Sequence, residues 1–133
     1  MNKLLISALV LFSTSALANY DIVVSKRSQS MTIYEDGELI ERWPVSTARK
    51  GYYTPTGTFR PYSYQPIHYS KEYDNAPMPH SIFFSGGYAI HATPHVGNLG
   101  RPASHGCVRL SPNNAYTLYN MTKGESTTIT IKD

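Results

Sequence analysis

The chain has 133 residues, and its twelve Lys and Arg against nine Asp and Glu give a formal net charge of +3 at pH 7. These charges are spread along the sequence rather than gathered in a stripe, so they give no support to nucleic-acid binding. A single cysteine excludes an internal disulfide, so a core and a sheet have to stabilise the chain. The length fits one compact domain.

The N-terminal residues have the pattern of a secretory signal peptide. Lys3 supplies a positive start, Leu4 to Phe12 are mostly apolar, and Ala16-Leu17-Ala18 has the small-x-small form of a cleavage site. The apolar run is too short to span a bilayer. We therefore predict a signal peptide over residues 1–18, one domain over residues 19–133, and export to the periplasm or cell envelope.

The first part of the predicted domain is rich in strand signals. Tyr20 to Ser25, Ser30 to Glu35 and Glu38 to Ser46 are each expected to form a strand. Asp36-Gly37 favours a tight hairpin between the last two strands. Farther along, Thr54-Pro55-Thr56-Gly57-Thr58-Phe59 predicts a turn that enters a short strand.

The middle of the chain is harder to interpret. Residues 60–80 hold many prolines and tyrosines without a clean period, which predicts an ordered irregular loop. Its aromatic rings either pack on the sheet, which is the role we favour, or line a groove. Ser81 to Ser85 and Tyr88 to Thr93 then predict a hairpin around Gly86-Gly87. This assignment places His91 near the end of a buried strand.

The last part of the chain contains the predicted helix. Residues 93–103 are rich in Gly and Pro and predict a loop that brings the following segment back toward His91. Ser111-Pro112 is a good helix start, with a serine cap and a proline at the first helical position, and Gly124 can end the helix. Thr127 to Lys132 alternates Thr and Ile and predicts a final strand.

Cys107 and His91 are the strongest candidates for chemistry. Acyl transfer by cysteine needs a thiolate, a base that generates it and donors for the oxyanion. Cys107 is the candidate nucleophile, and His91 the base that could hold it as a thiolate near neutral pH. Gly106 allows a close approach of the backbone, so the amides of Gly106 and Cys107 are candidate oxyanion donors.

Each of the residues near Cys107 has two possible roles. Ser104 could hydrogen-bond a histidine or cap a turn, and His105 could shape the oxyanion site or contact substrate. Arg109 follows Cys107 by two residues on an extended segment, so it could share its face and bind a substrate carboxylate. Instead of binding substrate, Arg109 could form a structural salt bridge. Instead of acting as a nucleophile, Cys107 could be a small buried hydrophobic residue.

Other roles for the histidines have less support. A metal site could in principle use His91, His95, His105 and Cys107, but their spacing matches no standard pattern, so we expect no metal and no other cofactor. His68 and His80 are expected to be surface or packing residues. The single tryptophan, Trp43, is expected in the core.

The segment Arg101-Pro102-Ala103-Ser104-His105-Gly106-Cys107-Val108-Arg109-Leu110, preceded by Ile90-His91, resembles the signature of L,D-transpeptidase catalytic domains of the YkuD type. The Thr54 to Phe59 turn also resembles a motif of that family. The resemblance implies a mostly β, single-domain, sandwich-like fold with one short helix after the catalytic cysteine. One position departs from the family pattern, because many members have glycine where this chain has Ala92.

The resemblance also implies a substrate and a reaction. Cys107 would attack a peptidoglycan stem tetrapeptide at its third residue, D-alanine would leave with a proton from His91, and an amine acceptor would resolve the thioester. The products would be a 3-3 cross-link, an anchored lipoprotein or an exchanged D-amino acid. We expect a monomer that binds stem peptides and no nucleic acid. A hydrolase on the same site, either an L,D-carboxypeptidase or an amidase, and a non-catalytic wall-binding module are the alternatives.

Overall fold

The structure is a computed structural model, and it describes residues 17–133. All but the last two residues of the predicted signal peptide, 1–18, lie outside this range. No helix within residues 17–133 is long and apolar enough to cross a membrane.

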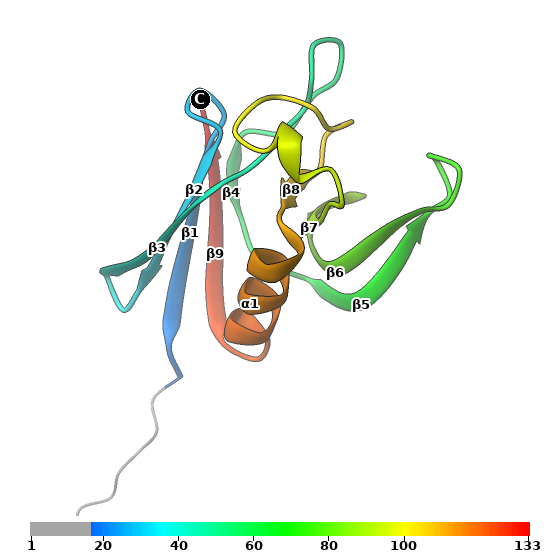
Figure 1. The fold of residues 1–133 in the computed structure, drawn as a ribbon. Coiled ribbons are helices and arrows are strands. Elements are labelled where there is room, and N and C mark those ends of the chain that lie inside the picture. The colour runs from blue at the N-terminus through cyan, green and yellow to red at the C-terminus, as the bar shows by residue number, and fades with distance from the viewer. Residues whose placement is uncertain (1–16) are drawn as a thin grey trace, which may run out of the picture.

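One sheet lies on the left of the molecule in Figure 1. Its five strands run in the order β3-β2-β1-β9-β4. Their bounds are β1 Asn19–Ser25, β2 Ser30–Glu35, β3 Glu38–Pro44, β4 Gly57–Phe59 and β9 Ser126–Lys132. Asp36 and Gly37 both have positive φ, as the predicted tight hairpin between β2 and β3 requires. β1 pairs antiparallel with β2 and parallel with β9.

The second sheet carries the candidate site. Its four strands run in the order β5-β6-β7-β8. Their bounds are β5 Ser63–Ser70, β6 Ala76–Ser85, β7 Tyr88–Ala92 and β8 Val108–Leu110. A short 3-10 helix, η1 Val96–Asn98, lies in the loop between β7 and β8, and α1 Pro112–Thr122 follows β8. Ser111 caps α1 by accepting a hydrogen bond from the Asn114 N–H, as predicted.

The core lies between the two sheets and the helix. Ile22, Ile33 and Ile129 stand side by side across β1, β2 and β9, and all three are fully buried. From the second sheet Ile90 and Val108 face them, and Leu118 of α1 completes the same cluster. This arrangement confirms the prediction of a mostly β, sandwich-like fold with one short helix after Cys107.

The prediction of an irregular loop over residues 60–80 is wrong. β5 and β6 form a long antiparallel hairpin, the arm, which projects from the body on the right of Figure 1. Pro66 is tolerated because β5 is the edge strand of its sheet. Pro77 and Pro79 lie in a part of β6 that pairs only with β5, so their missing N–H groups can face the unpaired edge.

Candidate active site

The pairing of β7 with β8 decides which side chains face the site. The two strands are parallel, with Ile90 opposite Val108 and His91 opposite Arg109. Since side chains alternate along a strand, Ile90 and Val108 point into the core while His91 and Arg109 point to the other face. Cys107, two residues before Arg109, packs beside Ala89 on that outer face. His91, Cys107 and Arg109 therefore share one surface.

This surface forms one wall of a cavity of about 790 Å³. The opposite wall is the arm, which contributes His68, Tyr73, Met78 and Phe83. Lining a groove, the alternative role expected for the aromatic rings of residues 60–80, describes Tyr73, which lines this cavity. His68 was expected at the surface or in packing, and it does pack edge-on to Phe83, but on the inner face of the arm.

His91 is held in one orientation by the backbone. Its side chain is 7% exposed, and its Nδ1 lies 2.7 Å from the carbonyl oxygen of Ala92. A carbonyl can only accept, so Nδ1 carries the proton and Nε2 is left as an acceptor. Burial, with a smaller contribution from the nearby Arg109, lowers the pKa of His91 to about 4, although the Ala92 hydrogen bond opposes the shift. The imidazole is therefore neutral at pH 7.

Cys107 is a neutral thiol in the same environment. Burial raises its pKa, while a backbone hydrogen bond from Ala89 and the charge of Arg109 act in the opposite direction. Its Sγ lies 4.0 Å from the carbonyl oxygen of Gly87. The expected thiolate, held by a charged imidazole, therefore does not describe the resting site. The buried surroundings favour an uncharged pair, in which a proton moves only when the thiol reacts.

Ser104 caps the turn that presents Cys107. Its hydroxyl donates to the Cys107 carbonyl oxygen at 2.6 Å and accepts from the Gly106 N–H at 3.0 Å. Of the two readings of Ser104, the structure therefore selects the turn cap over a bond to a histidine. It also corrects the oxyanion assignment, since the Gly106 N–H already has an acceptor. The Cys107 N–H is the remaining candidate of the two.

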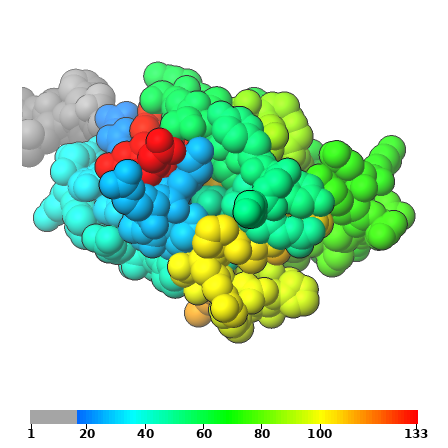
Figure 2. All heavy atoms as spheres, turned by 90° about the horizontal axis from the view of Figure 1, so that it is seen from above, coloured from blue at the N-terminus to red at the C-terminus, as the bar shows by residue number. Residues whose placement is uncertain are grey.

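Thr54 fixes the same turn from the other side, which explains the Thr54-Pro55 motif. Its hydroxyl accepts from the Ala48 N–H at 2.9 Å and donates to the Gly106 carbonyl oxygen at 2.8 Å. The backbone N–H of Arg49 adds a bond to the Ser104 carbonyl oxygen at 2.9 Å. Viewed from above, the teal segment near residue 50 lies against the yellow segment near residue 100 (Figure 2).

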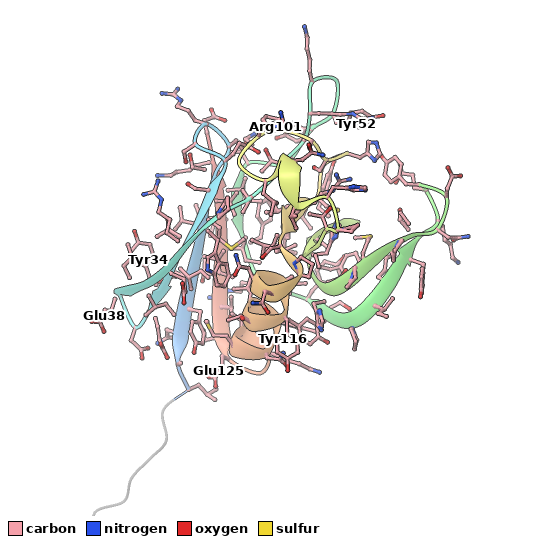
Figure 3. All side chains as sticks on the ribbon, in the orientation of Figure 1. Tyr34, Glu38, Tyr52, Arg101, Tyr116 and Glu125 are labelled. Atoms are coloured by element: carbon pink, nitrogen blue, oxygen red, sulfur yellow. The ribbon has the colours of Figure 1, made fainter. Side chains whose placement is uncertain are left out.

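His105 lies between two tyrosine rings rather than beside the thiol. Tyr73, at the end of the arm, stacks on it with ring centroids 4.2 Å apart and planes 20° apart. Tyr52, at the top of the molecule in Figure 3, packs on it at 4.7 Å. Burial, with Arg49 and Arg109 nearby, lowers the pKa of His105. His105 thus joins the arm to the turn that carries Cys107.

The remaining histidines lie outside this arrangement or at its margin. His80 contacts the rings of Tyr116 and Tyr119 on α1 and does not line the cavity, as expected of a packing residue. His95 lies at the outer wall of the cavity. Residues 17–133 contain no group of three or more His, Cys, Asp or Glu arranged to hold a metal ion.

The buried imidazole predicts a loss of stability in acid. In the unfolded chain a histidine binds its proton below pH 6.5, whereas the folded chain resists protonation of His91 down to about pH 4. The stability from this group is therefore present above pH 6.5 and is lost as the pH falls toward 4, by about 3 kcal/mol. Urea unfolding at pH 7 and pH 4 should show this extra loss in the wild type and not in His91→Asn. Equal losses in both proteins would contradict it.

Comparison with known proteins gives a consistent result. The YkuD family model, described as the L,D-transpeptidase catalytic domain, matches residues 19–131. A Bacillus licheniformis protein named L,D-transpeptidase YkuD is 26% identical over 95 residues, which are 68% of this chain and 53% of that protein.

Two solved structures have the same fold. An L,D-transpeptidase from Mycobacterium smegmatis has a TM-score of 0.81 at 27% identity, over 87% of this chain and 59% of its own. An L,D-transpeptidase from Stackebrandtia nassauensis has a TM-score of 0.76 at 30% identity, over 84% of this chain and 54% of its own. This chain therefore spans somewhat more than half the length of each of these proteins.

Proposed function

Because the chain belongs to the family of L,D-transpeptidase catalytic domains, we propose that it is a cysteine acyltransferase that acts on peptidoglycan stem tetrapeptides. The observation that carries the proposal is the placement of Cys107 and His91 on one wall of one cavity, with the imidazole fixed by the Ala92 carbonyl. A nucleophile, a base and a group that orients the base are the parts that acyl transfer by cysteine requires.

Acylation would begin with the two neutral groups. The Cys107 thiol gives its proton to Nε2 of His91 while the sulfur attacks the carbonyl carbon of the third residue of the stem peptide. The Ala92 carbonyl, which accepts from Nδ1, stabilises the imidazolium that forms. The Cys107 N–H stabilises the oxyanion of the tetrahedral intermediate. The bond to D-alanine then breaks, and the leaving amine takes the proton from Nε2.

Deacylation reverses these roles. An acceptor amine attacks the thioester carbon and loses a proton to His91, and the Cys107 sulfur leaves and recovers that proton as a thiol. The acceptor can be the side-chain amine of a second stem peptide, an amine of a wall-linked lipoprotein or a D-amino acid. Peptidoglycan lies outside the cytoplasm, so this reaction requires an exported protein. We therefore also propose a signal peptide over residues 1–18 and export to the periplasm or cell envelope. The domain over residues 19–133 is proposed to act as a monomer.

The decisive experiment is mass spectrometry of products from a disaccharide-tetrapeptide, with and without a D-amino acid acceptor. Because Cys107 is the only cysteine, protein blocked with iodoacetamide is a site-specific control. We expect released D-alanine, a protein adduct with the mass of the acyl group, and transfer products, all only in the unblocked protein. Free tripeptide as the sole product would make the protein a carboxypeptidase. Binding without turnover would support a wall-binding module.

A further inference from the structure

Arg109 is a positive charge on the cavity wall that forms no ion pair within residues 17–133. Its side chain is half-buried, and burial lowers its pKa. One of its guanidinium nitrogens, Nη1, donates to the Ala103 carbonyl oxygen at 3.3 Å. Within residues 17–133 the one ion pair joins Lys26 and Asp133, so the structural salt bridge considered for Arg109 does not form there. A half-buried guanidinium without a carboxylate is costly unless a ligand supplies the anion.

A second arginine raises the positive potential at the same place. Arg49 is tied by its backbone to Ser104, and its guanidinium lies 4.9 Å from the centre of the Tyr52 ring, which in turn packs on His105. Arg49 lowers the pKa of Arg109, and both arginines lower the pKa of His105. The acidic residues of the cavity wall, Glu72 and Asp74, are exposed at the end of the arm instead.

The position of Arg109 relative to the reacting atoms indicates which anion it meets. It lies directly opposite His91 in the β7–β8 register, a separation of about 5 Å between neighbouring strands. His91 must reach the nitrogen of the leaving residue, because it protonates that nitrogen. The carboxylate of a leaving amino acid is only two bonds from the nitrogen, so it lies beside Arg109 when the nitrogen lies beside His91.

We infer that Arg109, supported by the charge of Arg49, binds the terminal carboxylate of the amino acid that leaves. The inference rests on the proposed function and deepens it. It makes Arg109 the residue that restricts the donor to a stem peptide ending one residue after the scissile bond. A donor extended by one more residue, or one with an amidated terminus, presents no anion at this position.

The test compares two donors, the tetrapeptide with a free terminal carboxylate and the same peptide ending in D-alaninamide. Kinetics are measured for the wild type, Arg109→Gln and Arg109→Lys. Arg101→Gln is the matched control, since Arg101 lies in the loop that precedes β8 (Figure 3). Its side chain bonds to Gly97 and Asn98 and does not line the cavity.

A charge-assisted bond to the carboxylate should make the wild type prefer the acid by about 10- to 100-fold in kcat/KM. Arg109→Gln should lose this preference, because turnover of the acid falls by much more than turnover of the amide does. Arg109→Lys should keep part of it, and Arg101→Gln should keep all of it. Equal losses on both donors in Arg109→Gln, or a wild type without preference, would overturn the inference.

If the wild type releases nothing from either donor, the proposed function fails, and binding decides the carboxylate site separately. Calorimetry with protein carrying Cys107→Ala should then show tighter binding of the acid than of the amide, and Arg109→Gln in the same background should remove the difference. Equal affinities for the two peptides in the background with Arg109 intact would overturn the inference independently of catalysis.

Discussion

Replacing Cys107 with serine is expected to lower the rate of D-alanine release by a factor on the order of 10⁴ to 10⁶, although the two side chains differ by one atom. The reason lies in the base. With a pKa of about 4, His91 is a weak base, and it can take a proton from a thiol far more readily than from an alcohol. The measurement is single-turnover release of D-alanine from the tetrapeptide.

Cys107→Ala gives the background rate for this comparison, and thermal unfolding shows whether both variants keep the fold. Cys107 packs against Met78, Phe83 and Ala89, and serine fits the same space, so the melting temperature should change little. Serine activity within tenfold of the wild type would show that the site relies on a stronger base than the buried imidazole described above.

Replacing Gly106 with alanine is expected to have the largest effect on stability. Gly106 has φ +142, and a Cβ on it would lie 2.6 Å from Cε1 of Tyr88 and 2.8 Å from the carbonyl oxygen of Tyr53. The backbone strain and the overlap together should reduce the free energy of unfolding by about 3 to 5 kcal/mol. The melting temperature should fall by about 10 °C or more. Urea and thermal unfolding both measure this loss.

Gly97→Ala is the matched control, because Gly97 lies in η1 with nothing within 4 Å of a built Cβ. It should change the free energy of unfolding by less than about 1 kcal/mol. Any Gly106→Ala protein that folds should also react slowly with the tetrapeptide, since the displaced turn carries Cys107. A variant as stable and as active as the wild type would contradict the constraint assigned to Gly106.

The parts of the fold that were predicted correctly are those that depend on neighbouring residues in the sequence. Asp36-Gly37 sets its own hairpin through positive φ, and Ser111-Pro112 caps its own helix, so neighbours in the sequence are sufficient. The two strands of the arm, β5 and β6, were not predicted because their sequences lack the usual signals of a strand. Pro66, Pro77 and Pro79 normally argue against strands. Ile67 and Tyr69 of β5 are exposed, so this strand has no buried apolar face that a pattern could indicate.

Some features of the candidate site can likewise be predicted from nearby residues, and others depend on contacts between distant segments. The residue types of Cys107, His91 and Arg109 indicate chemistry by themselves, and a period of two places Cys107 and Arg109 on one face. The stacking of Tyr73 on His105 and the bond from Thr54 to the Gly106 carbonyl oxygen join segments far apart in the chain. Only the folded arrangement reveals such contacts. The same holds for the hydrogen bonds by which Ser104 caps a turn and for the burial that keeps Cys107 and His91 uncharged.

The parallel pairing of β1 with β9 has a consequence for the order of folding. β9 is the last strand, yet it lies between β1 and β4 in the five-stranded sheet. A chain emerging from the ribosome or a translocation pore can form the β1–β2–β3 meander early, but β1 keeps an open edge until Ser126–Lys132 arrive. Contacts between residues so distant in sequence slow folding and prolong the exposure of strand edges. The nascent protein therefore depends on the seven residues of β9 to close its core.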